Sequence, residues 1–403
     1  MYENKFAEYA QQHEPELYEL VKTIARIPAP TGKEEKRAEF CLNWLKAHGA
    51  KDAYVDEAGN VIFLYCGNEK KSPAGCTDSG MKDAGLQPDC TQNKPLIVFD
   101  AHMDVVFPDE TELPLEERDG KIYCPGVGDD TANLAVLLMT AAYAIEEQID
   151  TGEYGILFVC GVGEEGLGNL KGVREVCRVF GPRIHAFYAF DLTMEAYTCR
   201  AVGSVRYQIE VQTPGGHSYG CFGNTNANVE LARLICMLYQ IKVPARGKTT
   251  YNIGMISGGT SVNTIAQQAE MLYEIRSDNA EDLAELQACF GTVLEEYKKT
   301  CPKDVDIFVE IIGERPCERD VDEGQRMQMF RKVEDIVERV TGSVPVPKPC
   351  STDCNIPLSM GIPSVCVGTC RGAGAHTRGE FIEKDSLGLG LQIGLGLLEK
   401  CVK

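Results

Sequence analysis

Four apolar runs that each precede acidic or histidine residues constrain the fold of this chain most strongly. They are residues 96–99 before His102 and Asp104, 154–160 before Glu164 and Glu165, 184–190 before Asp191, and 364–368 before His376. Segments with helical spacing, such as residues 131–145 and 171–180, separate the runs, and a further helix is expected at residues 16–27. Strands that alternate with helices predict an α/β fold with a mostly parallel sheet flanked by helices. Such a sheet places ligands at the carboxyl ends of its strands.

The first run carries a His-x-Asp pair at its end. In an extended segment residues i and i+2 point the same way, so the His102 ring and the Asp104 carboxylate can meet. His102 would then bind a metal, while the Asp104 carboxylate holds the imidazole in its tautomer. A lone His-x-Asp is common by chance, so the pair gains its weight from the similar strand ends elsewhere in the chain.

Length and composition limit the possible classes of protein. A chain of 403 residues predicts two domains. The formal charge of -20 is spread along the chain, which argues against nucleic acid or an anionic membrane as a partner. The 18 cysteines are scattered through apparent core segments, and we expect reduced thiols. The chain starts without an apolar leader and has no window of about 20 apolar residues, which favours a cytoplasmic protein.

The sequence pattern changes near Arg200. Residues 204–212 alternate between apolar and polar, as a half-exposed antiparallel strand does, and two helices and further strands follow up to residue 312. We therefore expect an α+β domain at residues 200–314, inserted into a metal-binding domain formed by residues 1–199 and 315–403. Residues 67–94 are polar and rich in glycine and proline, which predicts an inserted surface loop.

Two histidines and three carboxylates at the strand ends suggest a pair of metal ions. The candidate ligands are His102, Asp129, Glu165, Asp191 and His376. This set suits two zinc ions or similar divalent cations with one bridging acid. Two dications and three carboxylates leave one positive charge, which accommodates a hydroxide, and Glu164 could accept the proton of the attacking water. Asp129 alone could equally be a helix cap.

A rival interpretation starts from the glycines at residues 161–166. The pattern Gly-x-Gly-x-x-Gly follows a strand, and Asp191 lies 25 residues on, as in a dinucleotide-binding fingerprint. Glu164 and Glu165 would place two negative charges where a pyrophosphate must approach backbone amides. An NAD-dependent oxidoreductase would also leave His102 and His376 without a role. This alternative and a non-enzymatic binding module are therefore disfavoured.

The order of the motifs resembles the co-catalytic zinc metallopeptidase family that contains peptidase T, carboxypeptidase G, acetylornithine deacetylase and carnosinase. The motifs are Ala-His-Met-Asp at 101–104, Gly-Asp-Asp at 128–130 and Ala-His-Thr-Arg-Gly-Glu at 375–380. The resemblance implies that His102 is a zinc ligand oriented by Asp104, that Asp129 bridges both metals, and that Glu164 is the general base. It also implies that Glu165 binds the second zinc, that Asp191 completes the first, and that His376 completes the second.

By the same resemblance, the inserted domain is a lid and dimerisation domain. His217 of Gly-Gly-His-Ser would hold the substrate carbonyl and act across a dimer, and Asn263 of Gly-Gly-Thr-Ser-Val-Asn is also a substrate-site residue. Arg276 would meet a substrate carboxylate. Taken alone, these residues could be a loop hydrogen-bonder, a turn residue and a surface ion-pair partner. Thr352-Asp353 matches a family position with a structural role.

Two features depart from the common pattern of this family. Many members have lysine after the paired acids, where this chain has Asp130-Thr131, and the segment at 67–94 is an addition. The first-zinc acid is Asp191, as in the family's aminopeptidases and dipeptidases, whereas its carboxypeptidases and deacylases tend to use glutamate.

The expected function is therefore that of a peptidase T-like enzyme. It would cleave di- and tripeptides, releasing the N-terminal residue, with two divalent metal ions as cofactors. Zinc is favoured over manganese or cobalt. Removal of an N-acyl group from an amino acid is the alternative within the family. The expected partners are a small peptide substrate and a second copy bound through the lid domain, with no nucleic acid and no membrane.

Overall fold

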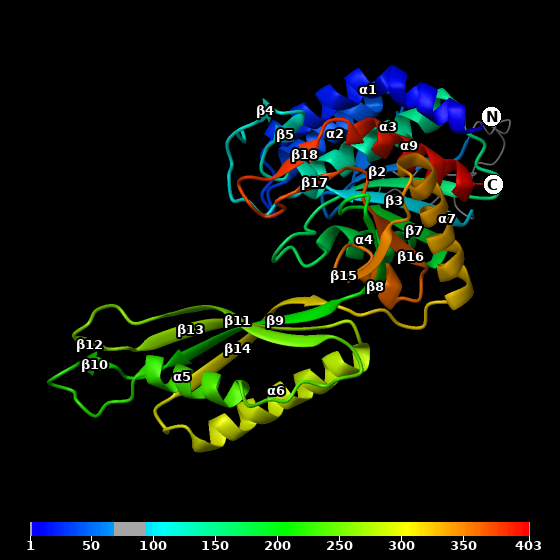
Figure 1. The fold of residues 1–403 in the computed structure, drawn as a ribbon. Helices are drawn as coiled ribbons and strands as arrows, with labels where there is room; N and C mark the ends of the chain where they lie inside the picture. The colour runs from blue at the N-terminus through cyan, green and yellow to red at the C-terminus, as the bar shows by residue number, and fades with distance from the viewer. Residues whose placement is uncertain (1, 68–93, 403) are drawn as a thin grey trace, which may run out of the picture. The chain divides into compact units, whose positions relative to one another are not determined.

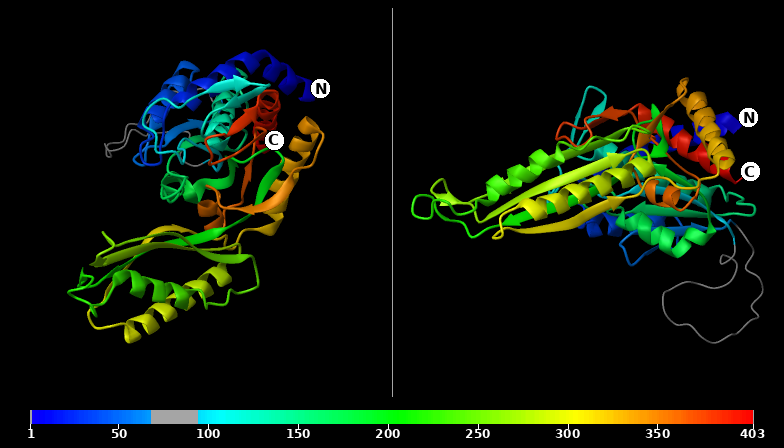
Figure 2. Two further views of the ribbon diagram at one scale, coloured as in Figure 1. Left: turned by 60° about the vertical axis from the view of Figure 1, so that its left-hand side comes forward. Right: turned by 90° about the horizontal axis from the view of Figure 1, so that it is seen from below.

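The structure, a computed structural model, describes residues 2–67 and 94–402. These residues divide into two compact units, which Figures 1 and 2 show as ribbons. Unit 1 takes in the described residues up to Cys199, Val321–Lys348 and the residues from Thr352 on, and unit 2 comprises Arg200–Asp320 and Pro349–Ser351. Most of the surface loop predicted at 67–94 lies outside the described residues. None of the described helices combines the length and apolar character that a membrane span requires.

Unit 1 is built on an eight-stranded sheet, which confirms the predicted α/β class. Its strands, in spatial order, are β1 (Tyr54–Val55), β2 (Val61–Tyr65), β6 (Gly155–Gly161), β3 (Leu96–His102), β7 (Ile184–Phe190), β16 (Ser364–Val367), β8 (Ala196–Ala201) and β15 (Val346–Cys350). Strand β3 is parallel to β6 and β7, and β16 is parallel to β7. Strands β2 and β8 pair antiparallel with their neighbours β6 and β16. The four central strands therefore end at one common edge.

Helices cover both faces of this sheet. Figure 1 shows α1, α3 and α9 on one side and α4 on the other. The helices of unit 1 are α1 (Tyr2–Arg26), α2 (Glu35–Ala47), α3 (Ala132–Glu146), α4 (Lys171–Phe180), α7 (Glu323–Thr341), α8 (Asn355–Ser359) and α9 (Ser386–Cys401). A π-helical turn, η1 (Val127–Thr131), precedes α3, and a 3-10 turn, η2 (Gly181–Arg183), follows α4.

The sequence explains why these central elements form. Every residue of β3 is buried, as expected for a parallel strand covered on both faces. On α4, Val173, Val176, Cys177 and Phe180 are buried at helical spacing. The ranges predicted for α4 and β7 agree with the structure.

Helix α1 begins well before the predicted start at Glu16 and continues through Pro15. Its early turns pack through Tyr9, whose ring lies edge-on to Tyr143 and whose hydroxyl donates to Glu146. Tertiary packing therefore keeps this segment helical despite the proline.

A smaller antiparallel sheet in unit 1 brings two distant segments together. Its order is β17 (Gly372–Ala373), β18 (Phe381–Glu383), β5 (Lys121–Tyr123) and β4 (Glu116–Arg118). Ile122 and Ile382 are paired in register and both are buried. The segment before η1 is thereby fixed beside the segment that follows His376.

Unit 2 is an antiparallel sheet with two helices packed on one face. The sheet order is β11 (Thr249–Gly258), β13 (Gln268–Ser277), β9 (Gly203–Gln212) and β14 (Asp306–Arg315). The helices are α5 (Ala227–Leu238) and α6 (Ala280–Thr300). A separate pair of short strands consists of β10 (Gly216–His217) and β12 (Thr264–Ile265). Along β9 the residues Val205, Tyr207, Ile209 and Val211 are buried and alternate with half-exposed polar residues. Asn279 caps α6 by accepting the N–H of Asp282.

Candidate metal centre

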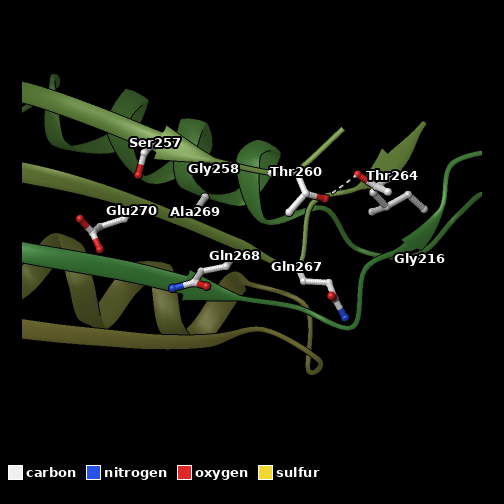
Figure 3. Close-up of a pocket in the computed structure, with 11 residues that line it drawn as sticks. Gly216, Ser257, Gly258, Thr260, Thr264, Gln267, Gln268, Ala269 and Glu270 are labelled. Atoms are coloured by element: carbon white, nitrogen blue, oxygen red, sulfur yellow. Dashed lines mark hydrogen bonds between the residues drawn. The ribbon is translucent and has the colours of Figure 1, made fainter. Parts of the chain in front are cut away.

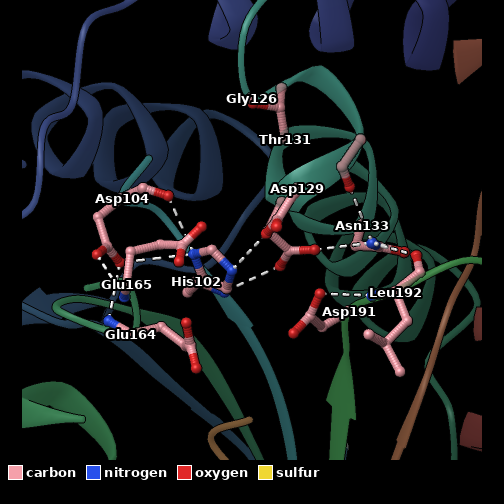
Figure 4. A network of polar contacts seen from close by, with 12 residues as sticks. His102, Asp104, Gly126, Asp129, Thr131, Asn133, Glu164, Glu165, Asp191 and Leu192 are labelled. Atoms are coloured by element: carbon pink, nitrogen blue, oxygen red, sulfur yellow. Dashed lines mark hydrogen bonds and ion pairs between the residues drawn. The ribbon is translucent and has the colours of Figure 1, made fainter. Parts of the chain in front are cut away.

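The ligand-type residues of unit 1 gather at the carboxyl edge of the parallel strands. His102 is the last residue of β3, Glu164 and Glu165 follow β6, and Asp191 follows β7 directly. Figure 4 shows the His102 ring with the carboxylates of Asp129, Glu165 and Asp191 around it. Asp129 comes from η1 rather than from a strand. The structure thus brings together side chains from four separate segments.

Asp129 lies between the two histidines. Its Oδ1 atom is 3.2 Å from Nε2 of His102, and its Oδ2 atom is 3.1 Å from Nε2 of His376. The same nitrogen of His376 lies 3.2 Å from Oε1 of Glu165. A carboxylate that presents one oxygen to each of two imidazoles has the geometry of a bridging ligand.

Within the described residues, three groups of side chains place their ligand atoms within 4.8 Å of one another. They are His102, Asp129 and Asp191; Asp129, Glu165 and His376; and His102, Glu164 and Glu165. The first two groups share Asp129, so the donors fit two neighbouring cations. Imidazole nitrogen and carboxylate oxygen suit zinc and also other divalent transition metals.

Burial shifts the pKa values of the carboxyl groups in this cluster. Burial and the charge of Asp129 raise the pKa of Asp191 to about 8, and burial also raises the pKa of Glu165. For Asp129 burial acts in the same direction, but hydrogen bonds to His102 and His376 outweigh it and leave the pKa low. Several carboxylates taken out of water at one point favour a bound cation, which would stabilise their charged forms.

Asp104 contacts both His102 and the turn that carries Glu164 and Glu165. Nδ1 of His102 lies 3.0 Å from the backbone oxygen of Asp104 and 3.5 Å from its carboxylate. That carboxylate also accepts the N–H groups of Glu164 and Glu165 at 3.0 and 2.9 Å. Burial would raise the pKa of Asp104, but the bond and charge of His102 together with these N–H groups hold it low. Asp104 therefore fixes the ring and the Glu164-Glu165 turn together.

Several residues that support the site had no role in the sequence-based prediction. Asp130 accepts the backbone N–H of His102 at 3.1 Å and the side-chain amide of Asn133 at 2.7 Å. Arg37 is fully buried and donates to the backbone oxygens of Met103 and Ile27, both at 2.7 Å. In the sequence, only the paired acids at 129–130 indicated part of this network. The remaining hydrogen-bond partners are distant from one another in the chain.

Asp353 lies near Asp100 in the interior, where both are almost fully buried. Burial raises the pKa of both carboxyl groups, that of Asp100 to about 7, and a hydrogen bond joins them. Together they form a buried acid pair, of which Asp100 belongs to β3.

The sequence pattern places His376 beyond the last buried strand. In the structure β16 ends at Val367, and His376 lies in a turn after the short β17. Its backbone φ is 63°, a conformation that residues other than glycine seldom adopt. The turn carries His376 to the edge where β3, β6 and β7 end.

The predicted substrate residues all lie in unit 2, at two separate places. His217 on β10 pairs with Thr264 on β12, and the N–H of Ser218 donates to the backbone oxygen of Asn263. Arg276 lies near the far end of β13, paired in register with Ser204. Its guanidinium bonds Glu274 through Nε at 2.6 Å and Nη2 at 2.9 Å. The structure thus brings His217 and Asn263 together but not Arg276.

A polar cavity of about 520 Å³ adjoins the His217–Asn263 segments. Figure 3 shows Ser257, Thr260, Thr264, Gln267, Gln268 and Glu270 around it, with backbone from Gly216 and Gly258. Hydroxyl, amide and backbone groups contribute about half of its wall. This part of unit 2 can therefore hydrogen-bond a polar ligand.

Comparison with known proteins identifies the class of this site. The family model described as Peptidase family M20/M25/M40 matches residues 98–400, which include every unit 1 residue of the candidate metal centre. This chain belongs to that peptidase family. It is a metallopeptidase, and the family match favours hydrolysis over the dinucleotide interpretation of residues 161–166. In agreement with this, α4 begins only at Lys171, beyond the glycine motif.

Relatives of this family member are distant in sequence. The uncharacterized protein YqjE of Bacillus subtilis is 24% identical over 333 residues, covering 78% of this chain and 83% of YqjE. A "Probable carboxypeptidase" of Uncinocarpus reesii is 22% identical over 277 residues, covering 63% of this chain and 59% of the fungal protein.

Solved structures of the family share the fold. Aminopeptidase PepT from Bacillus cereus superposes with a TM-score of 0.70 at 20% identity, covering 97% of this chain and 99% of PepT. A tripeptidase from Staphylococcus aureus gives a TM-score of 0.73 at 22% identity, covering 96% of this chain and 98% of the tripeptidase. At these identities the likeness concerns the fold and not the substrate.

Proposed function

We propose that this metallopeptidase binds two divalent cations, preferably zinc, and hydrolyses a peptide bond in di- and tripeptides to release the N-terminal residue. The observation that carries the proposal is the placement of Asp129, whose two carboxylate oxygens face His102 and His376 at 3.2 and 3.1 Å. His102, Asp129 and Asp191 would hold one cation, and Asp129, Glu165 and His376 the other. When bound, such ions supply Lewis acidity and lower the pKa of a water molecule.

Glu164 would move the proton in this reaction. Its carboxylate approaches His102 and Glu165 closely, and its backbone is fixed by the N–H bond to Asp104. A carboxylate held at this place can accept a proton from the attacking water and deliver it to the leaving nitrogen. Asp104 would keep His102 oriented with Nε2 toward the cation.

His217 would donate a hydrogen bond to the substrate carbonyl. Its Nδ1 atom accepts the backbone N–H groups of Tyr219 and Gly220 at 3.3 and 3.2 Å. A neutral ring with Nδ1 as acceptor carries its proton on Nε2, which is then free to donate to an oxyanion. Asn263 would line the same subsite, and Arg276 would bind the substrate's terminal carboxylate.

The positions of these residues support a homodimer through the lid domain formed by unit 2. Arg276 lies eight residues beyond Gln268 along β13, which corresponds to roughly 26 Å of extended strand. A tripeptide spans about 10 Å. A small substrate can therefore contact either Arg276 or the His217–Asn263 segments of one copy of unit 2, but not both. A second copy of unit 2 would supply the missing contact. Light scattering on the purified protein would test this assembly.

We also propose a cytoplasmic location. The cysteines of the described residues carry free thiols, and many of them are buried in the core. This state is typical of a reducing compartment. Detection of the thiols in protein isolated under alkylating conditions would test it.

The test of the function is a substrate panel combined with metal analysis. Protein stripped with a chelator would be reloaded with zinc, manganese or cobalt and given dipeptides, tripeptides and N-acetyl amino acids. Mass spectrometry would identify the residue released from a tripeptide with three different residues. Release of the N-terminal residue supports the proposal, release of the C-terminal residue indicates a carboxypeptidase, and turnover of the acetyl substrates alone indicates a deacylase.

A further inference from the structure

We propose that Glu380 is a positioning residue of the metal centre, which holds the backbone of residues 126–129 so that the Asp129 carboxylate stands between the two histidines. The inference rests on the proposed function only in so far as the site binds cations. It concerns a residue that is not among the candidate ligands and does not contact the reacting atoms.

Three backbone N–H groups of one short loop converge on the Glu380 carboxylate. Oε2 accepts the N–H of Gly126 at 2.8 Å, while Oε1 accepts those of Gly128 and Asp129 at 2.7 and 2.8 Å. Backbone N–H groups that converge on one anion form a concavity of the kind known as a nest. Here the anion is a side chain of the same chain.

The glycines of this loop make the close approach possible. Gly126 has a φ of 74°, and a Cβ atom added there would lie 2.3 Å from the Val105 side chain. A Cβ at Gly128 would lie 3.2 Å from Oε1 of Glu380. Larger residues at these positions would force the loop away from the carboxylate. The sequence Gly-Val-Gly-Asp therefore suits a loop that must wrap an anion.

Glu380 depends on these bonds for its own burial. Only 2% of the residue is exposed, and within the described residues no lysine, arginine or histidine forms an ion pair with it. A buried carboxyl group without a partner cation must be stabilised by hydrogen bonds. The loop and the carboxylate therefore hold each other in place.

The same residue also fixes the turn that carries His376. The N–H of Glu380 donates to the backbone oxygen of Thr377 at 3.2 Å, and its backbone oxygen accepts the N–H of Cys124 at 3.2 Å. Directly after it, β18 pairs with β5. One residue thus links the Asp129 loop to the His376 turn, and the 3.1 Å approach of Asp129 to His376 depends on that link.

Three substitutions distinguish a positioning role of Glu380 from an effect of its charge alone or on stability alone. Glu380→Gln keeps the shape but turns an NH2 group toward an N–H donor of the loop. Glu380→Asp keeps the charge but is one methylene too short to reach all three N–H groups. Glu383→Gln is the matched control, because Glu383 lies on the adjoining β18 and, within the described residues, its carboxylate does not bond the Asp129 loop.

The experiment measures zinc and cobalt binding to metal-free protein by calorimetry, together with the visible spectrum of the cobalt form and the melting temperature of the metal-free form. We expect Glu380→Gln and Glu380→Asp each to lower cation affinity by about 10- to 100-fold, the range found for residues that orient ligands. The cobalt spectrum should change in both variants, and Glu383→Gln should match the wild type.

Each other outcome has a distinct meaning. If Glu380→Asp binds cations as the wild type does while Glu380→Gln does not, the charge of Glu380 matters and its reach does not, and the positioning role is wrong. If both variants melt earlier but bind cations with unchanged affinity and spectrum, Glu380 serves stability alone. If the wild type itself binds no cation, the proposed function fails, independently of Glu380.

Discussion

Oδ2 of Asp129 lies 3.1 Å from Nε2 of His376, although the two residues are 247 positions apart in the sequence. The other oxygen of Asp129 faces His102. This relationship divides the ligand-type residues into two overlapping sets and explains how a single carboxylate could serve two cations. The predictions below test the chemistry and the stability of this arrangement.

Replacement of Glu164 should separate catalysis from metal binding. Glu164→Gln removes the group that would accept the proton, so kcat should fall by about 10²- to 10⁴-fold, the usual contribution of a general base. Because Glu164 is outside the two groups that share Asp129, the cation content should stay at the wild-type level. Steady-state kinetics with metal analysis of the same samples checks both points. Glu57→Gln, at an exposed position, is the control, and turnover that survives Glu164→Gln contradicts the role.

Cation binding should strengthen as pH rises from 6 to 8. In the metal-free protein, burial and the charge of Asp129 raise the pKa of Asp191 to about 8, and hydrogen bonds to Asp129 and Glu165 raise that of His376 to about 10. At pH 7 both groups hold a proton that a cation must displace. The apparent affinity should therefore rise about tenfold per pH unit for each displaced proton, until the pH passes the pKa of that group.

Calorimetry in two buffers of different ionisation enthalpy would count these protons directly. A release of at least one proton per protein at pH 7 agrees with the prediction. An affinity that stays constant between pH 6 and 8 would show that Asp191 and His376 are already unprotonated.

Arg37→Met should destabilise the metal-free protein by about 2–6 kcal/mol. The guanidinium is fully buried and donates to the backbone oxygens of Met103 and Ile27. Loss of the donor leaves one buried and one part-buried carbonyl group without these bonds, and each unsatisfied group costs about 1–3 kcal/mol. Urea unfolding followed by circular dichroism measures the change. Lys36→Met, at the exposed neighbouring position, should change stability by less than about 0.5 kcal/mol, and equal effects of the two variants would argue against the buried network.

Arg276→Ala should weaken cleavage of peptides with a free C-terminal carboxylate. A charge-assisted bond contributes about 1.5–3 kcal/mol, so kcat/KM should fall by about 10- to 100-fold for free peptides. Peptides with an amidated C-terminus should be affected much less, because they lack the group that Arg276 would bind. Arg233→Ala is the control, since Arg233 instead bonds the backbone oxygen of Thr300. An equal loss for free and amidated peptides would contradict carboxylate recognition.

The sequence predicted a large part of unit 1 because its signals are local. Apolar runs of strand length and apolar spacing on helices marked β7 and α4 within their observed bounds. Alternation marked β9 in unit 2, where only one face of the sheet is covered. Helix α1 was predicted too short because a proline signals a helix start locally, whereas the packing of Tyr9 on Tyr143 extends the helix through Pro15.

The candidate ligands were identified from residue type and from their places after strands, but their grouping was not visible in the pattern. Asp129 follows no strand, and His376 lies in a turn with a φ of 63° rather than at a strand end. Glu380 stood within a quoted motif without a role, and Arg37 gave no signal at all. Their partners are backbone groups, which have no signature in the sequence.

The sequence by itself determined the class of fold, the edge of the sheet where the chemistry lies and the types of group available there, because strand and helix periodicities are properties of short segments. Only the tertiary structure decided which oxygen of Asp129 faces which histidine, that Glu380 and Arg37 hold the surrounding loops, and that Arg276 lies apart from His217. Those relationships depend on contacts between segments far apart in the chain, and such contacts are fixed by packing and by the need to satisfy buried polar groups.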